Sequence, residues 1–293
     1  MQNGRVKLDN ENRLSLNFNR FNRYYGVTLE IEQENKETQF LSFEFKIAYV
    51  ETRYKSAILN IERFNLRINH QEPIYTMDEL AHKCGNIIYP LQISIDEQLQ
   101  TLSIENHKDI INRWQILREK TEQDEMTDTM RWYLDETESN IMNANEIIRN
   151  IRQDLFLSTL FVPLYTSYVP IHNTTETNVE VPLVPSSEPI RFLTKQKILR
   201  EYTTYNTITI TQKGRINDER SAYEIATRSI IGMGDGEKAI GNMEVTYQLN
   251  RETRIIDSII ANYNIQLSHN ESRAISLEAF HLEEKESVIF NKL

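Results

Sequence analysis

The chain has 293 residues, of which 39% are hydrophobic and 9% aromatic, and its formal net charge is −10. This length is enough for one large domain or two smaller ones, and the aromatic content argues against a disordered chain. The acidic charge repels polyphosphate and disfavours nucleic acid as a partner. The single cysteine, Cys84, excludes an internal disulfide and a multi-cysteine metal site.

The sequence has no uncharged apolar run of the roughly 18 residues that a membrane-spanning helix needs. The first residues, MQNGRVKLDNENR, lack the apolar centre of a secretory signal. We therefore expect no membrane insertion and a cytoplasmic protein, unless a leader has been removed from this sequence. The excess of Ile and Asn over Gly and Ala is typical of AT-rich codons and indicates a low-GC source, bacterial or viral.

Apolar and polar residues alternate between Val27 and Ile68. A period of two predicts strands with one buried face and one wet face. The short polar segment QENKET, residues 33–38, predicts an antiparallel hairpin between the first two strands. In the third run the alternation changes phase after Ile61, which predicts a bulge or a crossover near Glu62 and Arg63.

The middle of the chain changes to helical spacing. It predicts a short helix with a capping box, two short strands, a helix after Asn106, one long amphipathic helix and a buried apolar segment. The apolar stripe of the long helix favours packing on the protein's own sheet over a partner helix. The segments are, in this order, residues 76–86, 87–95, 99–104, 107–117, 127–151 and 155–165.

Five of the seven prolines lie between residues 163 and 189, so this segment is expected to be extended. Beyond it the period of two returns, with a polar turn at residues 250–253 that predicts a second hairpin. The predicted organisation is an N-terminal region of strands and helices at 1–165, a proline-rich extended connection at 166–189, and C-terminal antiparallel strands at 190–293.

The predicted fold class is α+β, in which the N- and C-terminal strand groups form an antiparallel, curved β-sheet packed against a central helical segment. Two independent sheets are the alternative. The segment GNMEVTYQLNRETRIIDSI, residues 241–259, resembles strand–turn–strand segments of curved-sheet ligand-binding lipoproteins of bacterial envelopes. No site residue is assigned from that resemblance.

The segment IGMGDGEKAIG, residues 231–241, contains four of the eight glycines. A phosphate-binding loop needs a helix after it, and a strand pattern follows here instead. We therefore predict a mobile loop between strands, at Gly232, Gly234 and Gly236, which is free to order on a partner.

The sequence offers little for catalysis. The six histidines show no metal-ligand spacing, and no G-x-S-x-G motif is present, so we expect no cofactor and favour a protein that is not an enzyme. One acidic arrangement, Glu30, Glu44 and Lys46, would suit a metal-dependent hydrolase. A solvated strand face with cross-strand charge pairs explains the same residues and is favoured.

Aromatic residues at the ends of predicted elements are the remaining candidates for a binding surface. They would rim a concave surface and anchor a partner, or alternatively close the ends of the core. The candidates are Tyr24, Tyr25, Tyr165, Tyr168, Tyr202 and Tyr205.

Three functions are consistent with these observations. The leading one is a non-catalytic intracellular binding or assembly protein, with another protein or a second copy as its partner. The second is a carrier of an apolar small ligand between the sheet and the helices. The third is the metal-dependent hydrolase.

Overall fold

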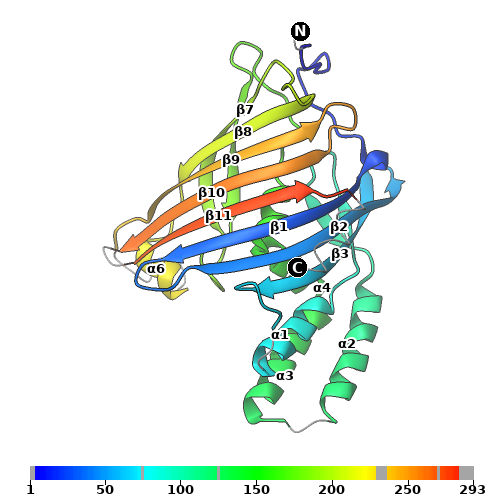
Figure 1. Ribbon diagram of the computed structural model, residues 1–293, viewed down its shortest axis with the longest axis vertical. Helices are drawn as coiled ribbons and strands as arrows, with labels where there is room; N and C mark the ends of the chain where they lie inside the picture. Colours follow the sequence, from blue (N-terminus) through cyan, green and yellow to red (C-terminus); the bar gives the residue numbers. More distant parts are fainter. Residues whose placement is uncertain (1–3, 74–75, 124–125, 229–235, 269–270, 284–293) are drawn as a thin grey trace.

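One antiparallel sheet dominates the computed structural model, which describes residues 4–73, 76–123, 126–228, 236–268 and 271–283 (Figure 1). Within these ranges eleven strands pair in the order β5-β4-β3-β2-β1-β11-β10-β9-β8-β7-β6. The strands are β1 Asn22–Gln33, β2 Gln39–Arg53, β3 Ser56–Ile68, β4 Leu91–Ile95, β5 Thr101–Ile104, β6 Thr174–Val181, β7 Ile190–Ile198, β8 Thr207–Ile216, β9 Ile240–Asn250, β10 Ile256–Ser268 and β11 Glu271–His281. The helices are α1 Thr76–Asn86, α2 His107–Thr121, α3 Asp128–Met142, α4 Ala144–Gln153, α5 Leu155–Leu160 and α6 Ala222–Thr227.

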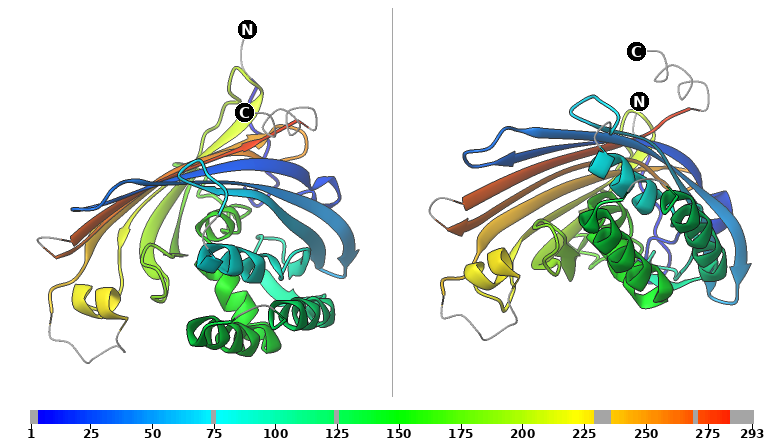
Figure 2. Two further views of the ribbon diagram at one scale, coloured as in Figure 1. Left: turned by 60° about the horizontal axis from the view of Figure 1, so that its bottom comes forward. Right: turned by 90° about the horizontal axis from the view of Figure 1, so that it is seen from below.

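The two strand groups meet at β1 and β11, which pair antiparallel with Val27 opposite Ala279. The N-terminal strands form one half of the sheet and the C-terminal strands the other half. The prediction of a single curved sheet is confirmed, and the alternative of two independent sheets is wrong. Figure 2 shows the sheet arching over the helices, which lie on its concave side.

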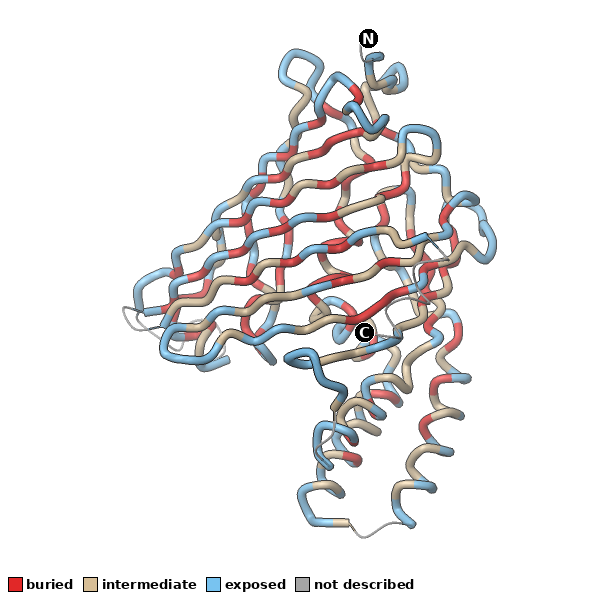
Figure 3. The backbone as a smooth tube through the Cα atoms, in the orientation of Figure 1, coloured by how far each residue is buried: buried red, intermediate tan, exposed pale blue. Residues whose placement is uncertain are grey.

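Alternation along the strands places the core on the concave face, which we call the inner face. In β10, Ile259, Ala261, Tyr263 and Ile265 are buried, whereas Ile260 between them is 43% exposed on the outer face. Figure 3 shows this alternation of buried and more exposed residues along successive strands. The period of two in the sequence therefore predicted the faces of these strands correctly.

The bulge predicted in β3 is present a little further along the chain. The register between β2 and β3 shifts between the pairs Ser42–Arg67 and Glu44–Phe64, so β3 carries the extra residue. Asn65 lies within this shift and has a φ of 53°. Asparagine adopts this left-handed conformation more readily than other side chains that carry a Cβ, so the bulge forms there and not at Glu62.

The prediction of a single long helix over residues 127–151 is wrong in the middle of this range. The chain forms two helices, α3 and α4, and Asn143 between them has φ −111° and ψ 110°. The Asn143 side chain accepts a hydrogen bond of 3.0 Å from the backbone N–H of Asn145. Asparagine is a favoured N-cap, and this cap starts a new helix where the apolar spacing alone predicted continuation.

The last helix of the central segment, α5, contacts the inner face of the sheet. The ring of Phe156 stacks on Phe45 with 5.1 Å between centroids and meets Tyr25 edge-on at 5.6 Å. The hydroxyl groups of Thr159 and Tyr263 lie 2.8 Å apart within hydrogen-bonding distance. Helices α1, α2 and α3 extend below β3 in Figure 1, and for them packing against the sheet stays a prediction.

None of the helices in the described ranges combines the length and the apolar character needed to cross a bilayer.

Candidate functional site

Strand β6 forms one edge of the sheet and pairs with β7. The carbonyl of Asn173 accepts a hydrogen bond from the N–H of Ile198 on the β7 side, whereas the carbonyl of Thr174 accepts from Val169 on the opposite side. Successive residues of a strand turn their backbone groups to opposite neighbours. The residues that turn their backbone N–H and C=O away from β7 are therefore Glu176, Asn178 and Glu180.

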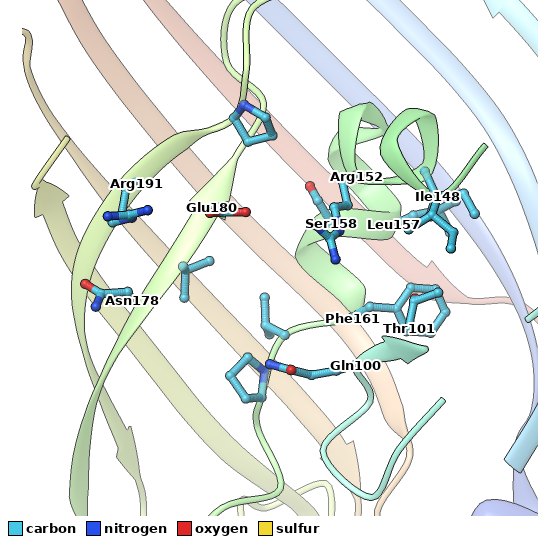
Figure 4. A pocket seen from close by; sticks show the side chains of 15 residues that line it. Gln100, Thr101, Ile148, Arg152, Leu157, Ser158, Phe161, Asn178, Glu180 and Arg191 are labelled. Atoms are coloured by element: carbon cyan, nitrogen blue, oxygen red, sulfur yellow. The ribbon is translucent and has the colours of Figure 1, made fainter. Parts of the chain in front are cut away.

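A hollow of about 310 Å³ lies beside this edge. Figure 4 shows its two sides: Asn178, Glu180 and Arg191 come from β6 and β7, and the opposite side comes from α4 and α5. The lining on that opposite side includes Ile148, Arg152, Leu157, Ser158 and Phe161, and residues at the start of β5 complete it, namely Gln100 and Thr101.

The hollow combines an apolar floor with a charged rim. Leu157 and Val179 are buried in its floor, whereas Arg152, Glu180 and Arg191 are exposed at its rim. The rim thus carries two arginines and one glutamate. Its chemistry suits a ligand that offers backbone or amide groups, an apolar side chain and an acidic group.

The segment between β6 and β7 is held in place by a buried ion pair. Arg220 contacts Asp218 at 2.8 Å and donates to the carbonyl oxygens of Glu188 at 3.1 Å and Pro189 at 3.0 Å. Burial raises the pKa of Asp218, but hydrogen bonds from Arg220 and from the backbone of Arg191 outweigh it and lower this pKa to about 2. Asp218 is therefore a carboxylate at neutral pH and keeps the rim in position.

The predicted tyrosines are distributed over different surroundings. Tyr25, Tyr165 and Tyr168 are buried, and their hydroxyl groups donate to the carbonyls of Ile256, Arg254 and Leu164 respectively. Burial raises the pKa of each of these three phenols. These three tyrosines therefore lie inside the protein. This agrees with the alternative prediction that the aromatic residues close the ends of the core.

The other three tyrosines lie elsewhere. Tyr24 is on the outer face, where its hydroxyl donates to Glu44. Tyr202 is also buried, at 8% exposure, with the guanidinium of Arg251 4.3 Å from its ring centroid. Tyr205 is 88% exposed in the turn before β8. The structure does not gather the six predicted tyrosines onto one surface.

Of the three predicted loop glycines, Gly232 and Gly234 lie outside the described residues. Gly236 is described and lies next to Ser221: a Cβ built on it would be 3.3 Å from the Cβ of Ser221. Ser221 also forms a bridge with Lys238. The end of the predicted loop therefore runs along the start of α6.

Of the acidic arrangement, Glu30 and Glu44 line a common hollow on the outer face over β1 and β2, whereas Lys46 does not line it. Glu44 accepts hydrogen bonds from Tyr24 and from Asn65, the latter at 2.9 Å. In the ranges that the structure describes, no group of three or more His, Cys, Asp or Glu residues has the arrangement to hold a metal ion.

Sequence reasoning missed the lining of the hollow beside β6. Arg152 lies on α4, one position beyond the helix predicted over residues 127–151, and Asn178 and Glu180 lie in the segment predicted as an extended connection. The alternation in TETNVEV, followed at once by Pro182, was a usable signal. Proline at a strand end is typical of edge strands.

No family model matches the chain, and no curated protein matches it. Among solved structures the chain is similar to one titled "Lipid-protein interactions in lipovitellin", with a TM-score of 0.48 and 15% sequence identity. The alignment covers 89% of this chain and 25% of that chain, so this chain spans about a quarter of the length of the lipovitellin chain.

Proposed function

We propose that the protein is a non-catalytic cytoplasmic binding protein that takes up an extended segment of another protein along the free edge of β6. The observation that supports this proposal is the direction of the backbone groups of Glu176, Asn178 and Glu180, which point away from β7. Of these three residues, Asn178 and Glu180 also line the hollow. An added strand would receive main-chain hydrogen bonds from these groups, and the hollow would receive one of its side chains.

The charges of the hollow favour a particular kind of segment. Arg152 and Arg191 outnumber Glu180 at the rim, and Val179 and Leu157 supply an apolar floor. An extended segment with one apolar and one acidic side chain matches both. In this proposal the central helical segment forms part of the binding site, because α4 and α5 form the wall opposite β6.

A proline substitution tests the proposal. Asn178→Pro removes the N–H that faces the hollow and leaves the groups that face β7, because edge strands tolerate proline where the N–H does not pair within the sheet. Asn178→Ala is the matched control, since it shortens the side chain and keeps the backbone N–H. Peptides of 12 residues are selected from a displayed random library on the wild-type protein, and their affinities are measured by calorimetry.

We expect selected peptides to bind Asn178→Pro about tenfold more weakly than wild type, and to bind Asn178→Ala within about twofold. Amide hydrogen exchange should slow at Glu176, Asn178 and Glu180 when a peptide binds. If the selected peptides bind Asn178→Pro and Asn178→Ala with equal affinity, or if the library yields no binder, strand addition at β6 is overturned.

The alternative, a carrier of an apolar small ligand between sheet and helices, is supported by the apolar part of the same hollow, at Ile148, Leu157, Phe161 and Val179. Native mass spectrometry of gently purified protein should then show an adduct. A clean mass of the chain alone in several preparations would contradict the carrier.

A further inference from the structure

A second hollow, of about 570 Å³, lies on the outer face of the sheet over β1, β2 and β11. This is the face turned toward the viewer in Figure 1, opposite the inner face that α5 contacts. It is separate from the hollow beside β6, and no residue lines both.

Small side chains on neighbouring strands form the floor of this outer hollow. Thr28 lies opposite Ser42 of β2, and Gly26 lies opposite Phe280 of β11. A Cβ built on Gly26 would come within 3.0 Å of Cδ1 of Leu282. The space above Gly26 is therefore occupied by the side chain of Leu282, and glycine allows this close contact at one end of the hollow.

Large apolar side chains form the sides of this hollow. Phe40 is 39% exposed and stacks on the ring of His70 with 5.7 Å between centroids. Phe280, across the floor, is 43% exposed, and Leu282 lies above Gly26. Two phenylalanines this exposed at one hollow give an apolar ligand aromatic surface to cover.

The lining is also acidic. It carries the carboxylates of Glu30, Glu44 and Glu278 and one guanidinium, that of Arg67, which has interactions of its own. Glu44 is only 6% exposed, and the donors Tyr24 and Asn65 both reach its Oε2. Its Oε1 has no hydrogen-bond partner among the described residues.

The phenol of Tyr24 beside Glu44 is a neutral hydrogen-bond donor. Burial first, and then the hydrogen bond and charge of Glu44, raise the pKa of Tyr24. Tyr24 therefore remains a neutral hydroxyl donor to Glu44 at neutral pH. A carboxylate that is 6% exposed, and whose Oε1 has no partner among the residues the structure describes, lies next to exposed aromatic rings and is suited to a cation with an apolar body.

We infer that the outer hollow over Gly26, Thr28 and Ser42 binds a small organic cation, with its charged group near Glu44 and its apolar body between Phe40 and Phe280. The cation would be a protonated or quaternary amine. Its charge complements the carboxylates, and the aromatic faces favour a cation over an anion of the same size.

The experiment titrates the full chain with hexyltrimethylammonium and, as a matched anion, hexyl sulfate, both below their micelle concentrations, by calorimetry. Glu44→Gln removes the charge while preserving the shape, and Gly26→Val displaces the Leu282 side chain that borders the hollow. Glu252→Gln, in the exposed turn between β9 and β10, is the charge-matched control. Glu278→Gln is the second carboxylate variant if Glu44→Gln fails to fold, as judged by circular dichroism.

We expect the cation to bind at least about tenfold more tightly than the anion, and each hollow variant to weaken it by about tenfold. Glu252→Gln should bind as wild type does. Equal binding of both probes, no binding of either, or full binding by Glu44→Gln and Glu278→Gln would overturn the inference. Asn178→Pro at β6 should leave cation binding unchanged, so this result does not depend on the outcome for the proposed function.

Discussion

Arg220 binds Asp218 through two parallel hydrogen bonds, which its Nε donates to Oδ1 at 2.9 Å and its Nη2 donates to Oδ2 at 2.8 Å. Both side chains are at most 9% exposed. The same guanidinium donates to the carbonyls of Glu188 and Pro189, so one ion pair fixes the segment that enters β7. A bidentate pair with additional hydrogen bonds is the arrangement in which burial of two charges is stabilising.

Asp218→Asn should lower the free energy of unfolding by about 2 kcal/mol at pH 7. The pKa of Asp218 is about 2, below its ordinary value of 3.8, so its contribution is complete above about pH 5 and is lost as the pH falls toward 2. Urea denaturation at pH 7, 4 and 2.5 should show the difference between variant and wild type shrinking with pH. The exposed neighbour Glu219 gives the control, Glu219→Gln; a difference that does not change with pH would contradict this account.

Phe156→Ala should be among the most destabilising truncations, at about 3–5 kcal/mol, because this ring is fully buried between α5 and the inner face. Phe64→Ala is the control, since Phe64 is 36% exposed on the outer face, and should cost about 1 kcal/mol. Chemical denaturation measures both. Equal losses would show that α5 does not anchor the inner face.

Gly241→Ala should destabilise the sheet by about 1–3 kcal/mol through overpacking. A Cβ on Gly241 would lie 2.3 Å from the backbone oxygen of Asn264, which cannot move without disturbing the pairing of β9 and β10. Gly4→Ala is the matched control, because its nearest neighbour, Cδ2 of Tyr202, is 3.7 Å away. Thermal unfolding that shifts equally in both variants would be inconsistent with this contact.

Cys84 should react slowly with iodoacetamide in the folded protein. It is 3% exposed, and burial raises the pKa of its thiol to about 11, despite a hydrogen bond with Thr137 that lowers it. The thiolate is the nucleophile, so the labelling rate should rise about tenfold per pH unit between pH 8 and 10 and should be fast in urea. Mass spectrometry follows the labelling, and fast labelling at pH 8 without urea would mean that α1 exposes this side chain.

The strands could be predicted because burial on one face of a sheet leaves a period of two in the sequence, as around Val27 and Tyr263. The break at Asn143 and the position of the bulge at Asn65 could not, because local hydrogen bonds and backbone conformation decided them against the apolar spacing. The candidate sites were largely missed. Asn178 and Arg152 become neighbours of one hollow only through the folded sheet, which no local pattern records.

The seam between β1 and β11 joins segments from nearly opposite ends of the chain, and Tyr24 and His281 are 257 positions apart. During synthesis β1 has its β2 partner early, while its other edge stays unpaired until β11 has been made, with His281 257 positions after Tyr24. For most of that time the nascent protein presents an open strand edge of the kind that pairs wrongly with other chains. Because this pairing joins distant parts of the sequence, the sheet closes late and folding is slow.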